Sequence, residues 1–363
     1  MNNPFLIIYT ISFLSTLFKI GKDNFKYFLL FFVILSPILI SFVNLSDVIG
    51  YLSYFNLIKN GYNLSEYRFE PFYYVVNKVF SYFTNFSFLR AFLIGFGLTV
   101  KINIFKRFGK QLPLTIFIYI ALQFFVDSYL LRLTFAVTFF LIASYFRYQN
   151  KNIFAILFAF LSINSHYSAI ATLPLLLIQN VNISNFYILF GALFFLVFSS
   201  ISQITSLAVE KLSIYLIPIV NFLGFSITET VQSYYLRVLE KQAFGESLGL
   251  FRGSLIIYAL IFIFFKILIS KNFEGEKKKT YNVIENGMLF SLLLLIIFNS
   301  QPIIGDRIAR YTLSFFPIAL GIIISRFTKD SMKIIIPFLS TIFLIISFFL
   351  NEGPFLPYSD LLQ

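Results

Sequence analysis

A single histidine, His166, is the first residue in this chain that suggests acid–base chemistry. It lies in LSINSHYSAIATLP, between two apolar runs, and its imidazole is the only side chain type here whose unperturbed pKa permits proton exchange near neutrality. We therefore expect His166 to be a general base, with Asp127 and Glu70 as the alternative bases. A histidine that only hydrogen-bonds a loop would give the same pattern.

Three arginines next to apolar runs suggest phosphate binding. Arg132 lies one turn inside an apolar helix in QFFVDSYLLRLTFA, and Arg307 and Arg310 are spaced i, i+3 in DRIARYTLSFFP. An arginine exposed to lipid at such a position is costly, so Arg132 must face a partner or a polar cavity, or snorkel to the surface. Planar guanidinium groups bind phosphate oxygens in pairs, which predicts a diphosphate site. Ion pairs of Asp127 with Arg132 and of Asp306 with Arg310 are the structural alternatives.

Aromatic and polar residues that could line a glycan path gather in three segments. They are Asp47 in NLSDVIGYLSYF, Tyr73 and Tyr74 in RFEPFYY, and Tyr234, Tyr235 and Arg237 in SYYLR. Flat aromatic faces can stack on sugar rings. Asp47 could instead cap a helix, Glu70 could stabilise the start of the helix that follows Pro71, and 225–252 could be an ordinary solvated amphipathic helix.

The composition places these residues in an all-α, polytopic membrane protein. Hydrophobic residues make up 58% of the chain and charged residues only 12%, and apolar runs of transmembrane length recur throughout. We predict about twelve spanning helices, within a range of about 11–14. They lie near 5–18, 27–44, 88–105, 112–127, 130–146, 153–165, 167–180, 186–205, 251–270, 283–299, 308–325 and 333–350. Two shorter apolar stretches, 72–86 and 212–223, are predicted to be interfacial or re-entrant.

The net charge of +12 is explained by orientation in the membrane and needs no nucleic-acid partner. With an N-terminus outside, the five short basic loops at 19–26, 106–110, 147–151, 271–279 and 326–333 all fall in the cytoplasm. Residues 1–363 then form a single polytopic membrane domain whose long outer loops, at about 44–86 and 206–250, carry short interfacial helices. The cytoplasmic loops are too short for a soluble catalytic domain. Gly95 and Gly97 lie within a predicted span, where they indicate close packing and not a phosphate loop.

The absence of cysteine and the single histidine restrict the possible chemistry. Disulfides, thiolate catalysis and Cys-ligated metals are excluded, and a His-rich metal site cannot form within a monomer. We therefore expect a metal-independent protein without a cofactor.

The order of these features resembles the EpsG family, which comprises Wzy-like polymerases of O-antigen, capsule or exopolysaccharide repeat units. The likeness covers most of residues 40–330 and depends mainly on the Arg-x-x-x-Ala of 132–136 and the His-Tyr-Ser-Ala of 166–169, with a weaker Asp–Tyr spacing after the second span. The resemblance implies an undecaprenyl-diphosphate-linked glycan as donor and as acceptor, at the extracytoplasmic face of the bacterial cytoplasmic membrane. A flippase and a chain-length regulator are candidate partners beside the membrane lipid. Sugar identity and linkage do not carry over.

Three other functions remain open at this point. A flippase for the same lipid-linked unit would need arginines deep between its helices and often two similar halves, whereas the ionisable residues here are peripheral and no repeat is visible. An O-antigen ligase shares the substrate and the outer-face site, so the sequence does not separate it from a polymerase. A purely structural membrane subunit would not need the isolated arginines or His166.

Overall fold

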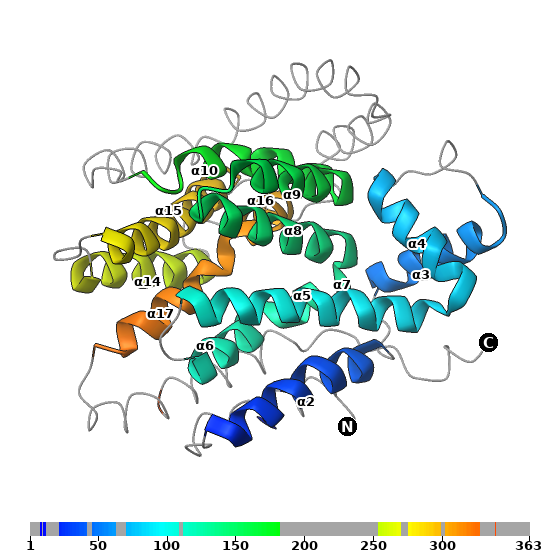
Figure 1. Ribbon diagram of the computed structural model, residues 1–363, viewed down its shortest axis with the longest axis horizontal. Coiled ribbons are helices and arrows are strands. Elements are labelled where there is room, and N and C mark those ends of the chain that lie inside the picture. The colour runs from blue at the N-terminus through cyan, green and yellow to red at the C-terminus, as the bar shows by residue number, and fades with distance from the viewer. Residues whose placement is uncertain are drawn as a thin grey trace.

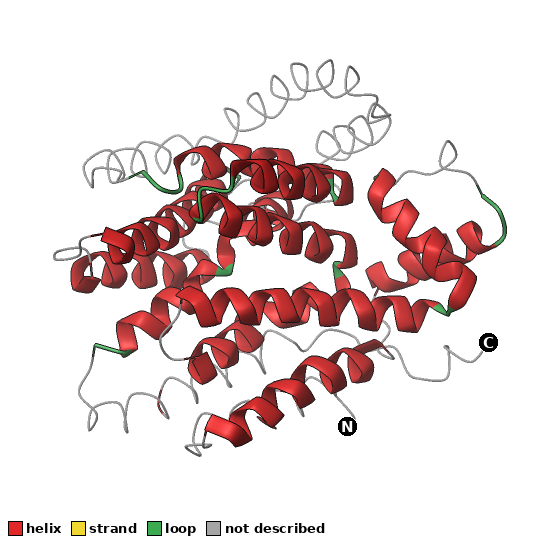
Figure 2. Ribbon diagram, viewed as in Figure 1, coloured by secondary structure: helices red, strands yellow, loops and turns green. Residues whose placement is uncertain are grey.

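The computed structural model describes ten parts of the chain, and every regular element in them is helical (Figure 2). The described residues are 8, 10–11, 22–41, 46–62, 70–108, 112–181, 253–269, 275–298, 302–326 and 338. Within these residues the prediction of an all-α fold is confirmed.

The helices follow one another with short connections (Figure 1). The first group contains α2 (Lys22–Ser41), α3 (Ser46–Lys59), α4 (Pro71–Phe83), α5 (Phe86–Phe108), α6 (Leu112–Tyr119), the π-helix η2 (Ile120–Phe124) and α7 (Phe125–Tyr129). Then come α8 (Leu131–Tyr148), α9 (Asn152–Ser165), the 3₁₀-helix η3 (Tyr167–Thr172), α10 (Leu173–Ile178), α14 (Gly253–Ile269), α15 (Gly275–Ile297), α16 (Pro302–Leu313) and α17 (Phe315–Ile324).

Three of the described segments are long and apolar enough to cross a membrane: Phe86–Phe108, Leu112–Tyr129 and Lys277–Ile297. Helices α16 and α17 form a fourth candidate if their 47° bend lies within one broken span. The predicted count of about twelve spans is therefore not confirmed. The 14 residues of α9 fall short of the roughly 20 that a membrane crossing needs, and the predicted span 186–205 lies outside the described residues. So does the stretch 212–223, and 5–18 and 333–350 lie almost entirely outside them.

The segment predicted to be interfacial, 72–86, is a separate short helix. Helix α4 begins where Glu70 is extended, with φ −65° and ψ 145°, before Pro71 at the first helical position, as the sequence predicts. Its 13 residues are too few for a span. The long loop expected at 44–86 also contains α3, which has Asp47 in its first turn, where a carboxylate suits the positive end of the helix dipole.

Helices α5, α8 and α9 pack side by side through the middle of the bundle (Figure 1). A Cβ atom built on Gly97 of α5 would lie 3.1 Å from Oγ1 of Thr138 on α8, a tight contact that would require the Thr138 side chain to move by a few tenths of an ångström. The hydroxyl of Ser162 on α9 donates to the carbonyl of Ala136 on α8 at 2.7 Å. Asn150, in the left-handed region with φ 61°, closes the turn between α8 and α9.

The direction of these helices defines two ends of the bundle. At one end lie α3, α4, the starts of α5 and α8, and the end of α9; at the other, α5 and α8 finish beside the start of α15 (Figure 1). Residues that are far apart in the sequence are thereby collected at each end.

Candidate functional site

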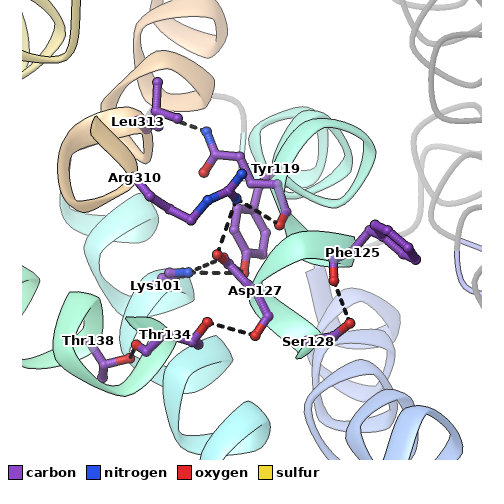
Figure 3. Close-up of polar contacts among 10 residues, drawn as sticks. Lys101, Tyr119, Phe125, Asp127, Ser128, Thr134, Thr138, Arg310 and Leu313 are labelled. Carbon is purple, nitrogen blue, oxygen red and sulfur yellow. Dashed lines mark hydrogen bonds and ion pairs between the residues drawn. The ribbon is translucent and has the colours of Figure 1, made fainter. Parts of the chain in front are cut away.

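Three charged side chains from three helices meet inside the bundle: Lys101 of α5, Asp127 of α7 and Arg310 of α16 (Figure 3). Nζ of Lys101 contacts Oδ2 of Asp127, and Nη1 of Arg310 lies 3.4 Å from Oδ1. The hydroxyl of Tyr119 donates to Oδ2 at 2.7 Å. Both oxygens of this buried carboxylate are therefore occupied, and Asp127 acts as the counter-ion of two cations, because a buried ion persists only when it is paired. We call Lys101, Asp127 and Arg310 the ion triad.

The π-helix η2 shapes the segment just before Asp127. Single π-turns inside α-helices are frequent at functional sites, because they shift the side chains that follow. The carbonyl of Gln123, within η2, accepts from Nη1 of Arg310 at 3.3 Å, and its amide donates to the carbonyl of Leu313 at 2.8 Å (Figure 3). Gln123 thus fixes α16 against η2. The buried Nε of Arg310 has no hydrogen-bond partner among the described residues.

Glu70 connects three elements that are distant in the sequence. Its Oε2 accepts from Nη1 of Arg132 at 2.9 Å, and its Oε1 accepts from the backbone N–H of Tyr167 at 3.2 Å. These partners lie 62 and 97 residues away. The Glu70 side chain is 4% exposed and that of Arg132 20%, so the pair is shielded from water on the carboxylate side and accessible on the guanidinium side.

Two buried tyrosines complete the surroundings of Arg132. Its guanidinium lies 5.8 Å from the centre of the Tyr51 ring, and the rings of Tyr51 and Tyr73 meet edge to face at 6.1 Å. Burial raises the pKa of both hydroxyls, so both remain neutral. Because Tyr73 is 0% exposed, this structure does not offer its ring to a sugar.

His166 lies where α9 ends, beside the Glu70–Arg132 pair. Its Nδ1 accepts from the backbone N–H of Ser168 at 3.3 Å and lies 2.9 Å from the Ser168 hydroxyl. Since Nδ1 accepts from a backbone donor, the neutral ring carries its proton on Nε2. The Ser168 hydroxyl is also 3.0 Å from the hydroxyl of Tyr311 on α16.

The electrostatic environment keeps the His166 imidazole uncharged. Its pKa is lowered to about 4, chiefly by burial; the charge of Glu70 raises this pKa, and the charges of Arg132 and Arg307 lower it. The ring is therefore in its neutral form at physiological pH. We refer to Glu70, Arg132, His166, Ser168 and Tyr311 together as the His166 cluster. Tyr311 follows Arg310 on α16, so the His166 cluster is connected to the ion triad through this helix.

The two arginines of α16 have different partners. Nη2 of Arg307 lies 3.7 Å from Oδ2 of Asp47, and both side chains are about one third exposed. Arg310 instead points inward to Asp127 and is 8% exposed. Neither ion pair that the sequence offers as a structural alternative is formed. Arg310 pairs with Asp127 and not Asp306, and Arg132 pairs with Glu70 and not Asp127.

Of the remaining glycan candidates, the structure describes only Tyr74. Tyr74 is buried, and its hydroxyl donates to the carbonyl of Tyr62 at 3.1 Å. Tyr234, Tyr235 and Arg237 lie outside the described residues.

Sequence reasoning missed three buried residues that hold the site together. Lys101 and Tyr119 bind Asp127, and Nη2 of Arg90 donates to the carbonyl of Ser128 at 3.2 Å. A signal existed for two of them, because Arg90 and Lys101 interrupt one apolar run, and a charge within a span is a functional candidate by default. The sequence contains no signal that singles out Tyr119, since it is one of 22 tyrosines. In the part of the chain that the structure describes, no group of His, Asp and Glu side chains could hold a metal ion.

Comparison with known proteins gives one match. The model of the EpsG family matches residues 25–359, nearly the whole chain. No curated protein and no solved structure matches this chain.

Proposed function

Because this chain belongs to the EpsG family of Wzy-like polymerases, we propose that it polymerises undecaprenyl-diphosphate-linked oligosaccharide repeat units. The reaction is a glycosyl transfer at the outer face of the bacterial cytoplasmic membrane, in O-antigen, capsule or exopolysaccharide synthesis. The growing chain leaves its lipid diphosphate and joins the next lipid-linked unit.

The observation that carries the proposal is the convergence of Glu70, Arg132 and His166. Glu70 holds Arg132 with one oxygen and the backbone beside His166 with the other. A guanidinium and a neutral imidazole are thus placed together at the edge of a shielded site. These are the two groups that transfer from a lipid diphosphate requires: a cation for the leaving group and a proton acceptor for the attacking hydroxyl.

In the proposed step, the acceptor hydroxyl oxygen bonds to the anomeric carbon of the donor. The bond from that carbon to the diphosphate oxygen breaks, and the diphosphate departs with the electron pair. Arg132 and Arg307 stabilise the negative charge directly. Arg310 adds positive charge from behind, because the ion triad contains two cations and one carboxylate. These cations can supply the charge that other transferases take from a metal ion.

The acceptor proton goes to Nδ1 of His166 through the Ser168 hydroxyl. Nδ1 is the nitrogen of the neutral ring with a lone pair, and the Ser168 hydroxyl already lies on it at 2.9 Å. Ser168 gives its proton to Nδ1 as it takes the proton of the acceptor, so the hydroxyl is restored within the step. We prefer His166 to Asp127 and Glu70 as the base, because both carboxylates are fully engaged by cations and backbone donors.

The glycan path is proposed to begin at the Asp47–Arg307 pair, which is the accessible edge of the site. Tyr234, Tyr235 and Arg237 are proposed to continue it. The buried Tyr73 and Tyr74 would contact sugar only if α4 moved; as placed, Tyr73 supports the Tyr51 ring next to Arg132.

The test is extension of a lipid-diphosphate-linked repeat unit by the purified protein, followed as chain length. A polymerase yields a ladder of longer lipid-linked products, and Ser168→Ala should slow it by at least about tenfold if the proton passes through the hydroxyl. Ser165→Ala is the matched control, because its hydroxyl bonds only the carbonyl of Leu161. Movement of the substrate across a vesicle without lengthening would indicate a flippase. Transfer only to a non-lipid-diphosphate acceptor would indicate a ligase.

A further inference from the structure

A cavity of about 540 Å³ lies at the end of the bundle opposite the His166 cluster, where α5 and α8 finish and α15 begins. Three cations line it, Arg107, Lys151 and Lys279, together with Tyr145 and Tyr148. We call it the basic pocket. The short basic loops of the sequence predict that this end faces the cytoplasm.

Aromatic rings and an amide hold two cations of the basic pocket in place. The guanidinium of Arg107 lies 5.9 Å from the centre of the Tyr145 ring, and Nζ of Lys279 lies 5.0 Å from that of Tyr148. Nζ of Lys279 also donates to the amide oxygen of Asn150 at 3.1 Å. None of the described lining residues is acidic, so no lining side chain among them offsets the positive charge, and the rings orient it.

An apolar stripe starts at the edge of this pocket. Lys151 immediately precedes α9, whose Ile153, Ile156, Leu157 and Phe160 are 82%, 70%, 49% and 58% exposed. Their spacing of i, i+3, i+4 and i+7 places them on one helix face. A molecule with an anionic head and an apolar tail could therefore occupy the pocket and the stripe together.

We propose that the basic pocket binds the phosphate headgroup of an anionic phospholipid, with an acyl chain along the exposed face of α9. Basic pockets between helices at the cytoplasmic surface suit such headgroups. The cavity volume of about 540 Å³ is many times the volume of about 30 Å³ that one water molecule occupies. The pocket therefore has room for more than a phosphate ion. The stripe gives the lipid a contact that free phosphate lacks.

The experiment titrates phosphatidylglycerol into the purified full-length protein in neutral detergent, with lipid retention by native mass spectrometry and the thermal midpoint as readouts. Phosphatidylcholine and inorganic phosphate are titrated in parallel. The expected result is retention and stabilisation by phosphatidylglycerol alone. In the double variant Arg107→Gln/Lys279→Gln the affinity for phosphatidylglycerol should fall about 25-fold, which is about fivefold for each cation.

The matched control is Lys106→Gln/Lys278→Gln, which removes the same charge from exposed neighbours that do not line the pocket. Equal losses in the two double variants would overturn the proposal, because general surface charge would then explain binding. Equal stabilisation by inorganic phosphate would also overturn it, in favour of a free anion. If the pocket variant fails to fold, Lys151→Gln at an exposed turn should still weaken retention about fivefold, and an unchanged affinity there would contradict the proposal.

Discussion

Both ends of the helical bundle collect cations, and they balance them in different ways. At the α4 end, Arg132 is met by Glu70, Arg307 by Asp47, and Lys101 and Arg310 by Asp127. At the other end, Arg107 and Lys279 lie over tyrosine rings, and the described residues that line the pocket carry no carboxylate.

In the proposed function, this difference separates charge that serves membrane orientation from charge that serves glycosyl transfer. The inside-positive pattern explains the basic pocket, whose described lining residues include three cations and no carboxylate. It does not explain Glu70 and Asp127, which are buried at a desolvation cost and hold cations in fixed positions. Fixed and partly desolvated charge is what a departing diphosphate needs.

The largest expected effect is that of His166→Ala. The variant should lose about a hundredfold to ten-thousandfold in turnover, because it removes the proton acceptor, while donor binding is largely retained since the arginines remain. Extension of lipid-linked units and binding of the lipid donor are measured side by side. Near-normal turnover would reduce His166 to a loop residue, and loss of both turnover and binding would make it part of the binding site.

The ion triad predicts the next largest effect, on stability. Asp127→Asn leaves Lys101 and Arg310 buried without a counter-ion and should cost about 3–5 kcal/mol. Asp47→Asn, at a pair that is one third exposed, should cost under about 1 kcal/mol. Thermal unfolding of both variants in one detergent makes the comparison. Equal midpoints would contradict the assignment of Asp127 as the central counter-ion.

The sequence can single out the individual candidate residues, because a charged or titratable side chain next to an apolar run is costly at its own position. Arg132, Arg307 and His166 stand out next to apolar runs, and Glu70 before Pro71 signals the start of a helix. Their partners could not be predicted in the same way. An ion pair of Arg132 with Asp127, five positions away, is only the structural alternative that the sequence offers. Arg132 instead pairs with Glu70, 62 positions away, because the packing of α4 against α9 decides the pairing.

The helical fold could also be predicted, and its interruptions could not. The apolar run 112–127 gives no sign of the π-helix η2, which is a change of hydrogen-bond register and not of composition. The short length of α9 follows from where Asn150 turns the chain and His166 ends the helix, both of which are single-residue events. The overlooked Lys101 is different, because its charge inside an apolar run was visible.

Replacement of arginine by lysine at Arg132 and at Arg307 compares a partly shielded cation with a more exposed one. Arg132→Lys should reduce the rate of chain extension by about tenfold, because the planar fork that contacts Glu70 and diphosphate is lost while the charge is kept. Arg307→Lys should cost less than about fivefold, since its pair is one third exposed and screened. A larger loss of rate for Arg307→Lys than for Arg132→Lys, at equal protein levels, would place the diphosphate at the exposed Asp47–Arg307 pair.

The smallest effect is expected on lowering the pH. In the proposed mechanism the neutral imidazole is the active form, and a pKa of about 4 for His166 keeps the ring neutral well below its ordinary pKa of 6.5. Turnover should thus stay constant from neutrality to about pH 5 and fall as the pH passes through about 4. Rates are compared with thermal midpoints at each pH to exclude unfolding. A fall centred near 6.5 would show that the ring is not held in this buried environment.

The most direct measurement of which end does the chemistry is photo-crosslinking of the substrate. A lipid-linked repeat unit with a photoreactive group beside its diphosphate is bound to the purified protein and irradiated, and the labelled peptides are mapped. The predicted result is label in α8 near Arg132 and in α16 near Arg307, displaced by unlabelled donor and unaffected by phosphatidylglycerol. Label confined to the basic pocket, near Arg107 and Lys279, would contradict the assignment of the His166 cluster as the site of glycosyl transfer.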